Sequence, residues 1–210
     1  MVNGSEALER LREGNRRFVA GLRSPETTLL AHTRIADLTR GQQPFAIVLG
    51  CSDSRVPAEI VFDQGLGDLF VIRVAGNIVA PSQIGSVEFA ASKFDTRLVV
   101  VLGHTQCGAI QATVSELQRG AGAQSRNIRS IVDRIRPAVE GLLTTELHSH
   151  PDALMHEAVR ANVRASVNQL RHGSELLESL VERRGLLVVG AEYSLETGTV
   201  DFFTGLPDAD

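Results

Sequence analysis

Two short stretches of this sequence hold most of the side chains that could do chemistry. They are Cys51-Ser52-Asp53-Ser54-Arg55 and His104-Thr105-Gln106-Cys107-Gly108. Together they contain both cysteines of the chain, a histidine, a carboxylate and a guanidinium. Two thiolates and an imidazole are ligands that zinc prefers, and a carboxylate or a water molecule can complete such a site. The residue types therefore predict a zinc centre.

The number of strong ligands favours a catalytic zinc over a structural one. Closed structural sites have four strong ligands, often in Cys-x-x-Cys pairs, and this chain has only two cysteines. Two thiolates balance the charge of Zn²⁺, so Asp53 would be an exchangeable further ligand, and Arg55 can bind the same carboxylate in a bidentate pair. We expect two states, one with Asp53 on the metal and one with Asp53 held by Arg55 and water on the metal.

Other interpretations of the cysteines remain open on the residues alone. A buried cysteine is often an inert small hydrophobe. Cys107 could also be a nucleophile with His104 as its base, although Cys51, Asp53 and Arg55 would then have no role. The N-terminus lacks a basic start followed by an apolar run, so we expect a cytoplasmic protein, in which two cysteines more than fifty positions apart should not form a disulfide.

Both stretches follow apolar runs that are typical of buried parallel strands. Such runs occupy residues 45–49, 69–74, 98–102 and 186–189, and residues 199–203 can form a hairpin with the segment around Tyr193. The expected fold class is α/β, with a central mixed sheet that has a mainly parallel four-stranded core and an added antiparallel strand, flanked by helices. Ligands of such sheets bind beyond the carboxyl ends of the strands, where both stretches lie if their strands are neighbours.

Helices are expected before, between and after these strands. Residues 5–21 have the apolar spacing of an amphipathic helix with Ser5 as its N-cap, and residues 82–94 form a crossover helix. A second early helix is expected over 28–40. The region 110–184 should be mostly helical, with breaks at 120–122, Pro137, Gly141, 148–151 and 173–174.

We expect a single domain over residues 1–210. Its parts are an N-terminal helical arm (1–41), a strand and helix core with the first metal ligands (42–104), a helical region (105–184) and C-terminal strands (185–210). The charge balance is mild, with 21 Lys and Arg against 25 Asp and Glu, and aromatic residues make up 4% with no Trp, which argues against nucleic acid as a partner. No stretch approaches the roughly 20 apolar residues that span a membrane.

The motifs of this chain resemble those of the β-class carbonic anhydrases along nearly its whole length. The matching segments are Cys51-Ser52-Asp53-Ser54-Arg55-Val56-Pro57, Arg73-Val74-Ala75-Gly76-Asn77 and Gly103-His104-Thr105-Gln106-Cys107-Gly108-Ala109. The resemblance implies a zinc held by Cys51, His104 and Cys107, with Asp53 as an exchangeable fourth ligand that otherwise pairs with Arg55. It also implies a lyase, a zinc carbonate dehydratase, that reversibly hydrates CO₂ to bicarbonate and a proton by zinc-bound hydroxide attack.

The same resemblance implies substrate contacts and an oligomer. Gln42 matches a glutamine that binds substrate across a dimer interface, and the backbone N–H of Gly108 also matches a substrate contact. Phe70 matches an apolar wall of the pocket, while Ala75 is smaller than the valine of some members. The family forms dimers by exchanging N-terminal helices, and tetramers are common, so the implied partner is a second copy in a homodimer or tetramer. A related hydrolase of carbon disulfide and a zinc-stabilised binding module are the alternatives.

One part of the family pattern is absent from this chain. Some bacterial members have a second, non-catalytic bicarbonate site made by a Trp, an Arg and a Tyr. Arg73 and Tyr193 match the last two, but Val48 stands at the Trp position. A valine has no N–H donor, so we expect Arg73 to make local or interface hydrogen bonds instead. His148 and His150 are expected in a solvated loop without a function.

Overall fold

The computed structural model describes residues 2–23, 38–119 and 125–207. Within these residues five strands form one sheet in the order β2-β1-β3-β4-β5. They are β1 (Ala46–Gly50), β2 (Leu69–Arg73), β3 (Leu98–His104), β4 (Leu187–Tyr193) and β5 (Val200–Thr204). Strands β1 to β4 run parallel to one another, and β5 pairs with β4 as an antiparallel edge strand. The predicted mixed sheet is therefore confirmed.

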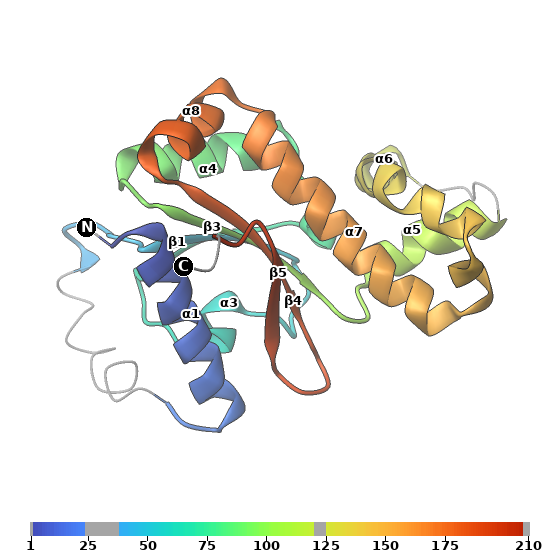
Figure 1. Ribbon diagram of the computed structural model, residues 1–210, viewed down its shortest axis with the longest axis horizontal. Helices are drawn as coiled ribbons and strands as arrows, with labels where there is room; N and C mark the ends of the chain where they lie inside the picture. Colours follow the sequence, from blue (N-terminus) through green and yellow to red (C-terminus); the bar gives the residue numbers. More distant parts are fainter. Residues whose placement is uncertain (1, 24–37, 120–124, 208–210) are drawn as a thin grey trace.

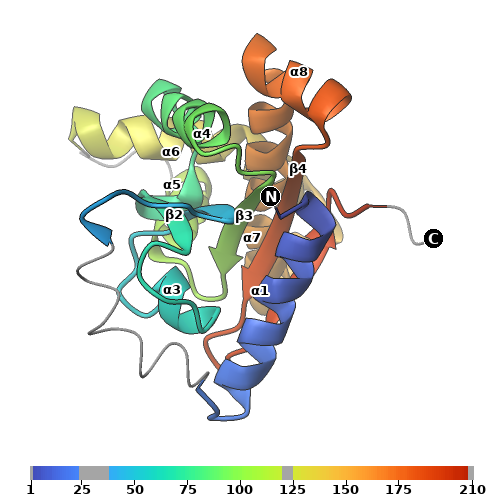
Figure 2. The ribbon, with the colours of Figure 1, turned by 90° about the vertical axis from the view of Figure 1, so that its left-hand side faces the viewer.

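Helices cover both faces of this sheet. The α-helices are α1 (Gly4–Val19), α3 (Ala58–Val61), α4 (Pro81–Lys93), α5 (Gly108–Arg119), α6 (Arg126–Val139), α7 (Pro151–His172) and α8 (Glu175–Arg184). Short 3₁₀ segments are η1 (Ala75–Asn77), η2 (Glu140–Thr144) and η3 (Glu146–Ser149). Figures 1 and 2 show α1 and α3 on one face, and α4, α7 and α8 on the other. Helices α5 and α6 lie beyond the sheet, beside α7 (Figure 1).

Strand β1 shows why the central strands are apolar without interruption. All five of its residues are buried. Ala46 and Val48 pack in the cluster that contains residues of α1 and α3, whereas Ile47 and Leu49 pack in the cluster formed with α4, α7 and α8. Successive side chains of a strand point to opposite faces, so a strand covered on both faces needs an apolar residue at every position.

The helix boundaries correct two details of the sequence prediction. The N-cap of α1 is Asn3 in a capping box with Glu6, not Ser5. Asn3 satisfies the free N–H group of Glu6 in the first turn, and Glu6 returns a bond to the N–H of Asn3. Pro137 lies inside α6 rather than at a break. Proline removes one intrahelical N–H donor at this position, and the α-helix ends two residues later, where η2 begins at Glu140.

Other boundaries agree with the prediction or fall outside the described part of the chain. Helix α7 ends at Gly173, and Ser174 caps α8 by accepting a hydrogen bond from the N–H of Leu177. Residues 28–37 of the expected second helix and the expected break at 120–122 lie outside the described residues. No helix within the described ranges is long and apolar enough to cross a membrane.

Candidate metal centre

The two chemically rich stretches meet at the carboxyl ends of β1 and β3. These strands are neighbours, with Gly50 opposite Leu102, so the loop after β1 lies beside the last residue of β3. Cys51 follows β1, His104 ends β3, and Cys107 directly precedes α5. One ligand atom from each of the three residues lies within 4.8 Å of the others, and all three residues are buried. The predicted ligands are thus brought together at one point.

The turn after β3 directs His104 and Cys107 toward that point. Gln106 has a φ of 55°, in the left-handed region, which reverses the chain between the strand and α5. Thr105 ties this turn to the neighbouring hairpin. Its N–H donates to the carbonyl of Tyr193 at 3.0 Å, and its hydroxyl accepts from the N–H of Leu195 at 3.0 Å. The hairpin of β4 and β5 therefore supports the turn that carries the predicted ligands His104 and Cys107.

The hydrogen bonds of His104 leave one ring nitrogen available for a metal. Its Nδ1 lies 2.8 Å from the carbonyl oxygen of Thr105, and because a carbonyl only accepts, Nδ1 carries the proton. Its Nε2 is buried and has no hydrogen-bond partner. A lone pair on a buried nitrogen without a partner is costly. A metal ion at the centre of the cluster would satisfy it.

The two cysteines have the chemistry of a shared cation site. The hydrogen bond from Cys107, together with the bond from the N–H of Gly76, lowers the pKa of Cys51 to about 4 against the opposing effect of burial. The same bond to Cys51, with burial, raises the pKa of Cys107. Two sulfurs this close are both thiolates only beside a cation, which zinc would supply while a proton is released. The donor set fits zinc.

Asp53 stands beside this cluster and is held by Arg55. Arg55 donates from Nε to Oδ1 at 2.9 Å and from Nη2 to Oδ2 at 2.7 Å, and its backbone N–H also bonds Oδ1. These bonds hold the pKa of Asp53 well below its usual range. Oδ2 of Asp53 lies 3.9 Å from Nε2 of His104. The arrangement is that of the predicted state in which Arg55 holds the carboxylate.

Comparison with known proteins agrees with this geometry. The carbonic anhydrase family model matches residues 46–200. The chain belongs to the β-class carbonic anhydrases. It is 39% identical to a carbonic anhydrase of Mycolicibacterium smegmatis over 206 residues, which cover 98% of this chain and 96% of that protein. It is 37% identical to carbonic anhydrase 2 of Mycobacterium tuberculosis over 199 residues, or 94% and 91% of the two chains.

A solved structure supports the fold. One of two tetrameric β-carbonic anhydrases from the ascomycete Sordaria macrospora superposes with a TM-score of 0.73 at 23% identity. The match covers 84% of this chain and 90% of that chain. At this identity the likeness bears on the fold alone, and it agrees with the mixed sheet and its flanking helices.

Arg73 of this β-carbonic anhydrase is hydrogen-bonded to the loop that carries Cys51 and Asp53. Its Nε donates to the carbonyl of Cys51 at 3.0 Å, and its Nη2 donates to the carbonyl of Asp53 at 2.6 Å. The expected local hydrogen bonds of Arg73 are therefore confirmed. Val48 and Tyr193 are buried in the core on the α1 face, where the ring of Tyr193 lies 6.4 Å from that of Phe18.

Two predicted substrate contacts lie away from the metal ligands of the same chain. Phe70 pairs with Ile47 in the register of β2 and β1, near the amino ends of the strands, and its ring packs against Phe89 and Phe94. Gln42 precedes β1 and lines a hollow of about 650 Å³ that Phe94 also lines. Gly108, in contrast, opens α5 beside the cluster. Substrate contacts by Gln42 or Phe70 therefore require a second chain, and they stay predictions.

One hydrogen bond to the sulfur of Cys51 was not predicted from the sequence. The N–H of Gly76 donates to Sγ of Cys51 at 3.4 Å. Gly76 lies in one of the matching segments, and a Gly-Asn pair is a sign of a left-handed turn. That signal shows where the chain turns but not which sulfur the turned backbone meets.

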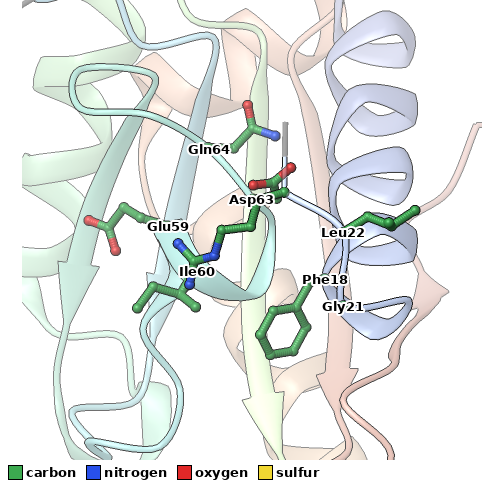
Figure 3. A pocket seen from close by; sticks show the side chains of 8 residues that line it. Phe18, Gly21, Leu22, Glu59, Ile60, Asp63 and Gln64 are labelled. Atoms are coloured by element: carbon green, nitrogen blue, oxygen red, sulfur yellow. The ribbon is translucent and has the colours of Figure 1, made fainter. Parts of the chain in front are cut away.

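A separate pocket lies away from the metal centre. Figure 3 shows this pocket of about 250 Å³ between the end of α1 and α3. Its lining residues are Phe18, Gly21, Leu22, Arg23, Glu59, Ile60, Asp63 and Gln64. Asp63 at its wall is bound by Nε of Arg17 at 2.6 Å. No predicted metal ligand lines it, so it has no part in the candidate metal centre.

Proposed function

We propose that this protein binds one zinc ion through Cys51, His104 and Cys107 and catalyses the reversible hydration of CO₂ to bicarbonate and a proton. The observation that carries the proposal is the convergence of three buried ligand atoms within 4.8 Å, one of them the unpartnered Nε2 of His104. Membership of the carbonic anhydrase family supports the reaction. Zinc bound there would generate a nucleophile from water near neutral pH.

Asp53 orients that nucleophile in our proposal. Its Oδ2 lies next to the ligand atoms, and Arg55 fixes both oxygens of the carboxylate. Because Arg55 holds the pKa of Asp53 far below its usual range, the carboxylate stays ionised and acts as a hydrogen-bond acceptor at neutral pH. The carboxylate would accept a hydrogen bond from the nucleophile and so orient that group toward CO₂. In the alternative state Asp53 would be released by Arg55 and would serve as an exchangeable fourth ligand of zinc.

The substrate site is completed by a second chain in our proposal. The N–H of Gly108, at the start of α5, binds a substrate oxygen, since the first turn of a helix favours anions. Gln42 and Phe70 of a partner subunit supply a polar contact and an apolar wall. The assembly is a homodimer or a tetramer, and the Sordaria macrospora relatives are described as tetrameric.

Two free buried thiols suit a reducing compartment, which supports a cytoplasmic location.

Stopped-flow CO₂ hydration on metal-analysed protein tests this function. We expect one zinc per chain, a catalysed rate that is lost on chelation, and recovery when zinc is restored. Carbon disulfide offered to the same preparation tests the alternative hydrolase. Fully zinc-loaded protein that hydrates CO₂ no faster than buffer would contradict the proposal and would favour the hydrolase or a zinc-stabilised binding module.

A further inference from the structure

The loop of η1 has an unusual backbone and touches the metal centre. Gly76 has a φ of 71° and Asn77 a φ of 42°, so two consecutive residues are in the left-handed region. Such residues are uncommon outside glycine and need support from their surroundings. The N–H of Gly76 donates to Sγ of Cys51. The conformation of this loop therefore decides whether the metal-binding sulfur receives that hydrogen bond.

Two polar residues of α7 hold this loop. Asn162 donates from Nδ2 to the carbonyl of Gly76 at 2.8 Å, and Ser166 donates from Oγ to the carbonyl of Asn77 at 3.1 Å. Asn162 is 2% exposed and Ser166 is 4% exposed. They are four residues apart, so they lie on one face of the helix. The other buried residues of α7 are apolar: Leu154, Ala158, Val159, Val163, Val167 and Leu170.

The loop is also confined on its other sides. A Cβ added to Gly76 would lie 2.9 Å from Cδ1 of Ile135 in α6 and 3.1 Å from Cβ of Ala109 in α5. Gly76 is thus held at both ends, with its N–H on Cys51 and its carbonyl on Asn162. Buried carbonyls need donors, and α7 supplies them for this residue and the next. Gly76 therefore connects Asn162 of α7 to the sulfur of Cys51.

We propose that Asn162 and Ser166 are positioning residues of the metal centre, which keep the N–H of Gly76 on the sulfur of Cys51. An N–H bond to a thiolate spreads its negative charge and sets how much charge the sulfur donates to a metal. The proposal rests on the zinc site of the proposed function. In this arrangement α7 tunes one of the ligands through Gly76, which lies 86 residues from Asn162 in the sequence.

Zinc affinity and the spectrum of the cobalt-substituted protein test the inference. Asn162→Ala should weaken zinc binding about tenfold, the lower end of what outer ligand contacts typically contribute, when measured by competition with a chromophoric chelator. It should also shift the thiolate-to-cobalt charge-transfer band, because Cys51 loses a hydrogen bond. A role in stability alone would change neither.

Asn15→Ala is the matched control. Asn15 is also a buried asparagine, and its Nδ2 donates to the carbonyls of Val61 and Gly198, in α3 and the β4–β5 hairpin. This variant should lower the thermal midpoint while zinc affinity and the cobalt spectrum stay at wild-type values. If Asn162→Ala behaves in the same way, the inference is overturned.

Ser166→Ala keeps the inference testable if Asn162→Ala does not fold. It removes a single oxygen, and we expect the same direction of change with a smaller size in both readouts. Wild-type affinity and spectrum in Ser166→Ala would then decide against the inference. Failure of the wild-type protein to bind zinc would refute the proposed metal centre itself. Tight zinc binding by wild type and variants alike would refute only the positioning role.

Discussion

Arg55 binds both carboxylate oxygens of Asp53, at 2.9 and 2.7 Å, beside the unpartnered Nε2 of His104. The guanidinium therefore competes with any metal in the cluster for the same carboxylate. Its bidentate hold favours the proposed state in which Asp53 would stand beside a bound metal without ligating it. The predictions about catalysis follow from this pair, and those about metal binding from the three ligands beside it.

Asp53→Asn should separate metal binding from catalysis. The amide has the same size but is a weaker acceptor and loses its charged pair with Arg55, while the three main ligands remain. We expect full zinc by elemental analysis and a loss of CO₂ hydration of about 10² to 10⁴, the range typical of a lost proton-handling group. Wild-type activity in this variant would leave Asp53 without the role argued above.

Loss of any one ligand should remove most of the zinc. Cys51→Ser, His104→Ala and Cys107→Ser each delete one of three converging donors. These variants should also unfold more readily, because metal binding contributes to folding. His148→Ala is a control histidine change at an exposed position, and it should keep its zinc. Full zinc content in Cys107→Ser would overturn the ligand assignment.

The hydration rate should rise from near neutral pH into the alkaline range. Arg55 lowers the pKa of Asp53, so this carboxylate is ionised throughout that range and does not titrate within it. The rise would then report the loss of a proton from the nucleophile that zinc generates from water. Stopped-flow rates at constant ionic strength measure it. A rate that is flat between about pH 6.5 and 9 would speak against this mechanism.

Bicarbonate should act only as an ordinary product inhibitor. Arg73 donates to the carbonyls of Cys51 and Asp53, and Val48 is fully buried in the core, so we expect no second bicarbonate site at Val48, Arg73 and Tyr193. Steady-state assays with added bicarbonate should give hyperbolic inhibition. A sigmoidal loss of activity, with conversion to a metal ligated by Asp53, is the result that this prediction forbids.

Glu192→Gln should change how stability depends on pH. Burial raises the pKa of Glu192, although His156 and Arg160 oppose the shift. A raised pKa means that the unfolded chain loses this proton first, so the contribution of Glu192 to stability falls as pH rises from the unfolded pKa through the folded one. The variant should therefore lose less stability than wild type over that interval, by at most about 1.4 kcal/mol per pH unit.

Urea unfolding at fixed protein concentration, from about pH 4.5 upward, measures this difference. The absolute stabilities are expected to differ for other reasons, because the variant also loses the charge that faces Arg160. The sign of the pH-dependent difference is the tested quantity. Parallel curves for wild type and variant would mean that Glu192 titrates normally in the folded protein.

The sequence by itself determined the sheet and the three residues predicted to bind a metal. Continuous apolar runs indicate strands buried on both faces, and chemically rich residues at the ends of two runs meet if those strands are neighbours, as β1 and β3 are. The types of Cys51, His104 and Cys107 favoured zinc over an inert or nucleophilic cysteine, because thiolates and imidazole are ligands that zinc prefers. These inferences depend on the local pattern of apolar residues and on the ligand chemistry of the side chains, and both follow from residue identity alone.

The tertiary structure alone decided what supports those ligands. The bonds from Asn162 and Ser166 span 86 and 89 residues, and no local periodicity marks which helix will lie against the η1 loop. It also placed Gln42 and Phe70 toward the opposite end of the sheet from the metal ligands, a relation set by strand register. Packing between distant segments chooses such partners, because a buried donor bonds whichever acceptor the fold brings to it.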